Sequence, residues 1–351
     1  MKERITFLDY MRVIACLMVI MVHSCEFFFI DGSNICISSL NDGFWVSVFD
    51  SAFRCSVPLF VLISAYLLVP LSGSVKEFFK KRLTRVVIPF VIWSLLYATL
   101  PFLWKEMSAN DVFDSILHLA YNFNGASGHM WFVYMLIGLY LFMPVISPWL
   151  HEAGKFSEQM FLLLWFISTF FPYIRSFTGD VYGECYWNEY NMLWYFSGFL
   201  GYVVLAHYIR FRIDWSANKK LLIGLLSYII GYAITGTIWY DRISTSVTLQ
   251  ELELSWRFCT PNVVLESFGA FLVIEALFSN KKDNSLIREM SNLSYGVYLM
   301  HIFVLGFVYK LLGEYFSTPL TIVLVGLTTF IICFILTKAI SFIPKSKYII
   351  G

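Results

Sequence analysis

Long apolar stretches separated by short polar ones dominate the chain. A membrane-spanning helix needs about 20 mostly apolar residues. Ten stretches fit this pattern, and they cover residues 5–30, 44–69, 86–104, 130–150, 156–174, 192–208, 221–239, 261–278, 294–312 and 320–342. A weaker stretch at 112–121 is too short to span, so we expect it on the membrane surface or re-entering the membrane. The pattern predicts an all-α, polytopic integral membrane protein in which residues 1–351 form a single transmembrane domain.

Composition supports a lipid bilayer as the protein's surroundings. Hydrophobic residues make up 58% of the chain, the mean hydropathy is +0.69, and charged residues make up only 14%, against about 25% in soluble domains. The net charge of +1 gives no indication of a nucleic-acid partner. The first apolar run is longer than the core of a signal peptide and lacks a small-residue cleavage site, so we interpret it as a retained helix.

The distribution of cations sets the expected orientation. Cytoplasmic loops of membrane proteins carry an excess of Lys and Arg. If the N-terminus is cytoplasmic, two of the 25 cations lie within the bilayer, namely Arg12 and Arg54, and most of the others fall on the cytoplasmic side. The outer side keeps only Lys105, Arg175, Arg242, Arg257 and Lys310. Ten helices then place both termini in the cytoplasm.

Several familiar kinds of site are missing from the sequence. There is no phosphate-binding GxxxxGK[ST], no GxGxxG, no HExxH and no GxSxG. The seven cysteines form no CxxC pair and no metal spacing, so we expect no metal site. Cys36, Cys185 and Cys259 fall in predicted loops, where a disulfide is compatible with the sequence but not specified by it.

The first predicted helix carries three ionisable residues. Arg12 and His23 are eleven residues apart, which is about three turns and a rise of about 16 Å on one helix face. Glu26 follows His23 by three residues on the same face. Such side chains normally face a protein interior or a water-filled cavity. We therefore expect a cavity in which Arg12 holds an anion, His23 moves a proton and Glu26 orients His23; alternatively, His23 only joins two helices.

Other cations extend this pattern. Arg54 lies in the middle of the second apolar stretch and needs an anionic partner, for which Glu26, Glu266 and a bound substrate are candidates. Arg82 and Arg85 begin the third stretch in the run FFKKRLTRVVIP and are one helical turn apart. Two arginines at this spacing bind a phosphate group together. The simpler alternative is a cytoplasmic anchor under the positive-inside rule.

Aromatic residues concentrate on the outer side. The loops around 105–129 and 175–191 mix Tyr and Trp with short polar residues, which suits sugar rings but is also typical of an interfacial aromatic belt. The fourth spanning stretch opens with GHMWFVYM, which places His129, Trp131 and Tyr134 at the outer face. The ninth contains SYGVYLMHIFVL, in which His301 either contacts a substrate or makes a packing hydrogen bond.

Five of these segments together resemble the acyltransferase-3 family of multi-pass membrane acyltransferases. The first helix is similar to the family's Arg-x10-His helix and reads LDYMRVIACLMVIMVHS. The second reads FRCSVPLFVLISAYLL, with Ala65 where the family usually has Gly. The family's Arg-x-x-Arg element resembles KRLTRVVIPF, and its later signature helices resemble MWFVYMLIGLYLFMP and LSYGVYLMHIFVL. The resemblance follows the order of the segments along most of the chain.

The resemblance implies an O-acetyltransferase-like enzyme of the bacterial cytoplasmic (inner) membrane. Such an enzyme moves an acyl group, commonly acetyl, from acyl-CoA to a hydroxyl of a sugar or envelope glycan, and it needs no metal. It also implies that His23 is the catalytic base or acyl carrier and that Arg82 and Arg85 contact the phosphates of CoA. We expect Arg12 to assist the donor, and Arg54, Trp131, Tyr134 and His301 to contact the acceptor.

Two other classes of protein explain the same polar face. A transporter or flippase of an anionic or lipid-linked sugar also places Arg, His and Glu in a membrane cavity, but it does not consume acyl-CoA. A structural or sensor module uses the same residues only to join helices. Substitution of Arg12 or His23 then costs stability and no turnover.

Overall fold

The computed structural model describes residues 4–104, 107–123, 125–179 and 189–351. The regular elements in this part of the chain are all helices except for one short hairpin of β1 (Ile30–Asp31) and β2 (Asn34–Ile35), and turns and loops connect them. Nine helical segments within it are long and apolar enough to cross a membrane. The protein is therefore an all-α, multi-pass membrane protein, as the sequence predicts.

The helices follow one another with short connections. In chain order they are α1 (Thr6–Glu26), α2 (Leu40–Phe53), α3 (Ser56–Leu68), α4 (Val75–Arg82), η1 (Leu83–Val87), α5 (Ile88–Leu103), α6 (Ala109–His118), η2 (Gly125–Met130), α7 (Trp131–Glu152), α8 (Lys155–Ser168), α9 (Phe171–Thr178), η3 (Asn191–Phe196), α10 (Leu200–Arg212), α11 (Ala217–Arg242), α12 (Leu249–Leu252), η4 (Glu253–Trp256), α13 (Pro261–Phe278), α14 (Ser285–Leu312), α15 (Thr318–Ser341) and α16 (Lys347–Ile350). Here η1 is a π-helix and η2, η3 and η4 are 3₁₀-helices.

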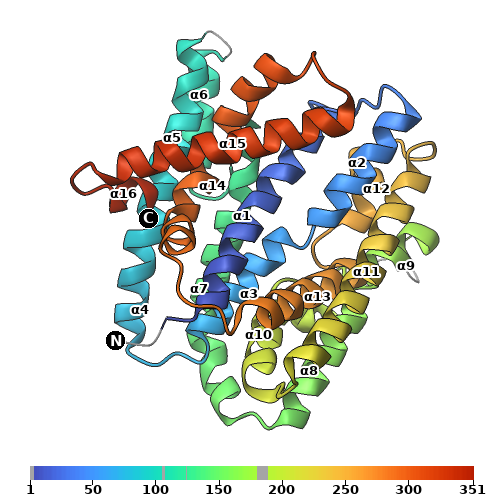
Figure 1. Cartoon of the computed structure of the whole chain (residues 1–351), viewed down its shortest axis with the longest axis vertical. Helices are drawn as coiled ribbons and strands as arrows, with labels where there is room; N and C mark the ends of the chain where they lie inside the picture. The colour runs from blue at the N-terminus through green and yellow to red at the C-terminus, as the bar shows by residue number, and fades with distance from the viewer. Residues whose placement is uncertain (1–3, 105–106, 124, 180–188) are drawn as a thin grey trace.

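Helix α1 occupies the centre of the molecule. It packs against α2, α3, α13, α14 and α15, which surround it in Figure 1. The paired helices α14 and α15 cover one flank, and α11 with α13 covers another. Because α1 is enclosed by other helices, the polar side chains it carries face protein rather than lipid, as ionisable groups in membranes require.

The second apolar stretch is not one helix but two, α2 and α3, with a break at Arg54 and Cys55. Pro58 explains the break, because a proline cannot donate to the carbonyl four residues earlier and its ring crowds that carbonyl, here that of Arg54. Backbone groups freed inside a membrane need partners. The N–H of Cys55 donates to Oε1 of Glu266 at 3.2 Å, and the Tyr228 hydroxyl donates to the Ala52 carbonyl at 2.6 Å.

The third apolar stretch contains a π-helical turn, η1, between α4 and α5. Pro89 follows it and lacks the N–H that would bond to the carbonyl of Arg85. Single π-turns inside helices are frequent at functional sites. Arg82 is the last residue of α4 and Arg85 lies within the π-helical turn, so their relative direction differs from that on an ordinary α-helix.

The sixth predicted helix, 192–208, differs from the structure. Residues 191–196 form the 3₁₀-helix η3, and α10 begins only at Leu200, after Gly198 with a φ of +76°. The backbone conformation at Gly198 ends one helix, and a Trp165 ring fills the space beside Gly201. Residues 198–212 still run antiparallel to α8. Gly198 at their start accepts a hydrogen bond from Trp165 near the end of α8, and Arg212 at their end donates to Glu158 near the start of α8. The return along α8 is therefore made by a helix of 13 residues, which is shorter than the predicted spanning helix.

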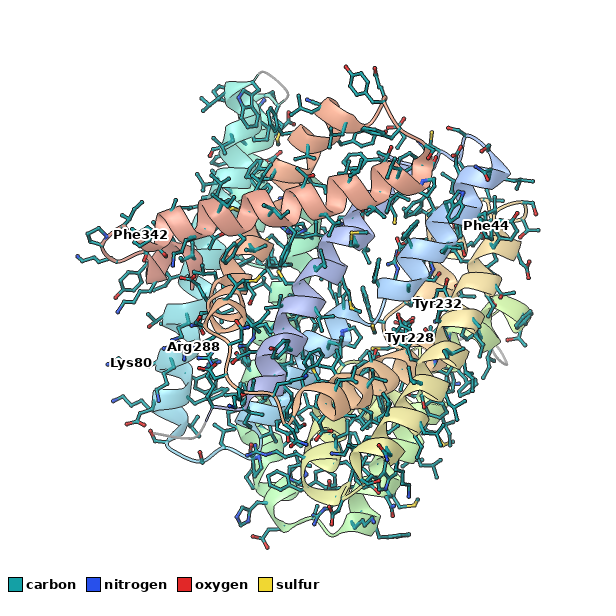
Figure 2. All side chains as sticks on the ribbon, viewed as in Figure 1. Phe44, Lys80, Tyr228, Tyr232, Arg288 and Phe342 are labelled. Atoms are coloured by element: carbon teal, nitrogen blue, oxygen red, sulfur yellow. The ribbon has the colours of Figure 1, made fainter. Side chains whose placement is uncertain are left out.

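Other parts agree with the expected topology. Figure 2 shows Lys80 and Arg288 on the flank near the N-terminus, whereas Phe44 lies toward the opposite end. The weak stretch at 112–121 corresponds to α6, a helix of 10 residues with no buried side chain. Cys36 and Cys259 are free thiols, and Cys185 lies outside the described residues.

Candidate active site

His23 and Glu26 form the ion-paired end of α1. Nδ1 of His23 lies 2.8 Å from Oε1 of Glu26, and their side chains are 17% and 38% exposed. A neutral histidine that donates from Nδ1 keeps its lone pair on Nε2. The sequence-predicted contact between these two residues is present, and it leaves Nε2 as the atom able to take a proton.

Two further histidines gather beside His23. The ring of His301 on α14 is centred 5.1 Å from the ring of His23, and the ring of His129 on η2 is 6.5 Å from His23 and 5.0 Å from His301. His301 is fully buried and His129 is 5% exposed. We call His23, His129 and His301 the histidine cluster. Among the described residues, no group of His, Cys, Asp and Glu side chains is arranged to bind a metal ion.

The two buried histidines keep unused polar atoms. Nδ1 of His301 donates to the carbonyl of Tyr298 at 2.5 Å, which leaves Nε2 without a hydrogen bond. Neither ring nitrogen of His129 makes a hydrogen bond of standard geometry within the described part of the chain. Buried polar groups without partners are rare and often mark a functional site. The cluster therefore offers both a base and unused hydrogen-bonding atoms.

Tyrosines fix the positions of these histidines. The Tyr298 hydroxyl donates to the carbonyl of His129 at 2.5 Å, and the Tyr97 hydroxyl donates to the carbonyl of Leu299 at 3.1 Å. The Tyr97 ring also lies 5.0 Å from that of His129. These contacts tie η2, α5 and α14 together at the point where the histidines meet.

A pocket of about 260 Å³ lies on the side of the histidine cluster toward the start of α1. We call it the Arg82 pocket. Six of its lining residues are Arg12, Ser64, Arg82, Arg85, Tyr140 and Tyr298. The sequence placed Arg12, Arg82 and Arg85 together on the donor side, and the structure brings all three to one cavity. Tyr298 belongs to its wall and also packs against His129 and His301, at 5.7 and 5.6 Å between ring centres.

Polar neighbours hold Arg12 in this pocket. Its Nη1 donates to the Ser291 hydroxyl at 3.0 Å and lies 3.9 Å from Oδ1 of Asp9. The Ser291 hydroxyl in turn donates to Asp9 at 2.7 Å, and Arg4 binds the same carboxylate through two nitrogens at 2.6 and 2.8 Å. The single carboxylate of Asp9 therefore faces both Arg4 and Arg12, so these three residues together carry a net positive charge.

Arg82 is held by aromatic faces. Its guanidinium carbon lies 5.7 Å from the centre of the Phe78 ring and 5.5 Å from that of Tyr140. Its Nε is buried and has no hydrogen-bond partner among the described residues. Stacking on aromatic rings leaves the planar donors of an arginine free for a phosphate or carboxylate. A cytoplasmic anchor that only faces water does not account for this arrangement.

The two ion-pair partners predicted for Arg54 within the chain were wrong. Its ion pair is with Asp50, four residues earlier on α2, and not with Glu26 or Glu266. Arg54 is 8% exposed, and its guanidinium lies over the Trp256 ring at 4.1 Å from the centre. Both charges still lie close enough to His23 to act on it electrostatically. Arg54 therefore belongs to the surroundings of His23 and is already paired.

Trp131 and Tyr134 lie outside the histidine cluster. Trp131 stacks on Phe258 with 5.3 Å between ring centres. The Tyr134 hydroxyl lies 2.8 Å from the carbonyl oxygens of Leu119 and Asn122. These contacts hold α7 against its neighbours and support a structural role for both residues.

Comparison with known proteins agrees with this arrangement. The sequence model of the acyltransferase-3 family, described as an acyltransferase domain, matches residues 5–338. The chain belongs to the acyltransferase-3 family. Comparisons with curated proteins and with solved structures gave no significant match. The protein is accordingly a membrane acyltransferase.

Sequence reasoning missed the place of two residues in this candidate site. His129 falls just before the predicted start of its helix at residue 130, so it was grouped with the outer face, whereas the 3₁₀-helix η2 draws it into the interior. Asp50 is four residues before Arg54, the spacing at which opposite charges pair on a helix. The four-residue spacing was therefore a signal in the sequence for the Asp50–Arg54 pair. No signal in the sequence shows that His129 meets His301.

Proposed function

We propose that this acyltransferase moves an acyl group, commonly acetyl in its family, from acyl-CoA to a hydroxyl of a sugar or envelope glycan in the bacterial inner membrane. One observation carries the proposal. The pocket lined by Arg12, Arg82 and Arg85 shares Tyr298 with the cluster that contains His23. The cationic pocket proposed for the donor thus adjoins His23, whose Nδ1 is paired with Glu26.

The Arg82 pocket suits the anionic part of CoA. Arginines bind phosphate groups through paired N–H donors, and Arg82 keeps a buried Nε without a partner. A whole CoA molecule is larger than about 260 Å³. We therefore infer that the pocket takes the diphosphate and the arm that bears the thioester, with the nucleoside outside it.

His23 would act on the acceptor hydroxyl. Nε2 takes the hydroxyl proton as the oxygen attacks the thioester carbonyl, the carbon–sulfur bond breaks, and the proton finally leaves with the CoA thiol. Alternatively, Nε2 accepts the acyl group and passes it to the hydroxyl. Glu26 supports the positive charge that His23 gains. A neutral His129 carries one N–H, and in this buried place it is available to the carbonyl oxygen as negative charge develops.

The test is acetyl transfer by the purified protein in detergent. Acetyl-CoA is supplied with a panel of oligosaccharides, and release of the CoA thiol is followed together with labelled acetyl on the sugar. We expect both signals in the wild type and their loss in His23→Ala. His151→Ala is the matched control, because His151 is a 73% exposed histidine far from the site. Full activity of His23→Ala would disprove the mechanism, and sugar movement without thiol release would favour a transporter.

A further inference from the structure

A second pocket, of about 420 Å³, lies at the other end of the protein from the Arg82 pocket. We call it the Arg257 pocket. Six of its lining residues are Phe171, Arg175, Glu189, Arg242, Glu251 and Arg257. Its volume is in the range of small-molecule sites. The wall segment η4 ends at Trp256, whose ring packs at 5.3 Å from that of Phe29, just after the end of α1 that carries His23.

Both carboxylates that the described residues contribute to this pocket are already used. Oε2 of Glu189 lies 3.0 Å from Nη1 of Arg175. Oε2 of Glu251 accepts the backbone N–H groups of Val247 and Thr248 at 2.8 and 3.2 Å, as the capping box of α12. Neither carboxylate is therefore engaged by the two remaining arginines.

Arg242 and Arg257 are held in place without being neutralised. Nε of Arg242 donates to the carbonyl of Glu251 at 2.7 Å, and Nη2 of Arg257 donates to the carbonyl of Gln250 at 3.4 Å. Within the described ranges, no carboxylate forms an ion pair with either guanidinium. Each side chain keeps further N–H donors in the fork geometry that matches a carboxylate or a phosphate.

The gathering of these cations is not explained by membrane topology. The positive-inside rule depletes Lys and Arg on the outer side, where the sequence leaves only five. Three of the five, Arg175, Arg242 and Arg257, line this one pocket although they come from α9, α11 and the loop after η4. An aromatic wall accompanies them, because Phe171 and Tyr190 lie 6.1 Å apart between ring centres.

A charged residue connects the pocket with the surroundings of His23. Glu253, on η4, interacts electrostatically with Arg54 and Glu26 on one side and with Arg257 on the other. A molecule bound between Phe171 and Arg257 is also next to η4, where the Trp256 ring centre lies 4.1 Å from the guanidinium carbon of Arg54. This is the side from which an acceptor would approach His23.

We propose that the Arg257 pocket binds an anionic sugar unit of the acceptor, one that carries a carboxylate or a phosphate. Arg242 and Arg257 bind the anionic group, and Phe171 with Tyr190 contacts the sugar ring. The inference rests on the proposed acyl transfer and adds to it the class of the acceptor. It makes the acceptor an acidic glycan rather than a neutral one.

The test measures binding directly, without acyl transfer. Isothermal titration of the full-length protein in a neutral detergent uses trigalacturonate, glucose 1-phosphate and, as the uncharged probe, maltotriose. We expect at least one anionic probe to bind at least about tenfold more tightly than maltotriose, and this preference to disappear in the double variant Arg242→Gln, Arg257→Gln. Lys310→Gln, which removes an exposed outer cation elsewhere, should keep the preference, and Arg257→Lys should keep part of it.

The remaining outcomes are also decisive. Equal binding of charged and neutral probes, or a preference that survives the double variant with an unchanged melting temperature, overturns the proposal. If the double variant is unstable, Arg257→Lys and the salt dependence of wild-type binding decide instead, because an ionic contact weakens with salt. Repeating the titration in nanodiscs separates a sugar from a lipid headgroup. Loss of anion binding in phosphatidylglycerol but not in phosphatidylcholine identifies a lipid site and overturns the sugar proposal.

Failure of this inference is distinguishable from failure of the proposed function. Thiol release from acetyl-CoA is measured on the same preparations. If release depends on His23 while anionic sugars show no preference, only the Arg257 proposal falls. If anionic sugars bind at the Arg257 pocket but no thiol is released with any acceptor, the acyl-transfer proposal falls, and the pocket remains an anionic-sugar site without an acceptor role.

Discussion

Replacing Glu26 by Gln removes the negative charge beside Nδ1 of His23 and keeps the size of the side chain. The two atoms are 2.8 Å apart, with side chains 17% and 38% exposed. A hydrogen bond to a charged group contributes about 1.5–3 kcal/mol. Because water reaches Glu26, we take the lower end, about 1.5 kcal/mol, which corresponds to about a tenfold lower kcat. Glu26→Ala also removes the hydrogen bond that orients the ring, so it should lose more.

The assay is the rate of labelled acetyl transfer at saturating acetyl-CoA and acceptor, which isolates kcat from binding. Glu314→Gln is the matched control, because Glu314 is an exposed carboxylate beyond the end of α14. Equal kcat for Glu26→Gln and wild type would refute the role of the charge. An unchanged kcat with a raised KM for the acceptor would show instead that Glu26 binds substrate and does not act through His23.

Three other substitutions have defined outcomes. Asp50→Asn leaves Arg54 buried without its charged partner and should lower the free energy of unfolding by about 3 kcal/mol in chemical denaturation. Adding Arg54→Gln should restore part of that free energy. A stability equal to that of the wild type would contradict the pairing. Gly201→Ala places a Cβ 1.9 Å from an indole ring and should cost about 1–3 kcal/mol by the same measurement. Arg82→Gln should weaken CoA binding about tenfold in equilibrium titration, whereas Lys76→Gln, on the same helix and exposed, should not.

Much of the fold follows from the sequence, because apolar length is a strong constraint in a membrane. In the part of the chain that the structure describes, nine of the ten predicted apolar stretches correspond to helical segments long enough to span a membrane, and the Arg-x10-His spacing placed Arg12 and His23 on one face of α1. The structure then brings Arg12 together with Arg82 and Arg85 in one pocket. Their roles in donor binding stay predictions until CoA binding is measured.

The missing parts depend on local backbone breaks and on contacts between distant segments. The break at Arg54 follows from Pro58, and the late start of α10 follows from the positive φ of Gly198, yet an apolar pattern alone runs through both. His129 and His301 are far apart in the chain, so only the packing of η2 on α14 shows that they meet. Trp131 and Tyr134 were chosen for their residue type, which does not distinguish a sugar contact from a helix contact.

The continuity of α1 has a consequence for the size of the donor. Arg12 and His23 stand on one unbroken helix, so the number of residues between them fixes their separation at about 16 Å. Deleting one residue between them would turn His23 by about 100° around the axis and shorten the distance by about 1.5 Å. In the proposed mode of donor binding, this spacing sets the length that the arm carrying the acyl group must have. A donor with a shorter arm, held by the same arginines, would leave its thioester below His23.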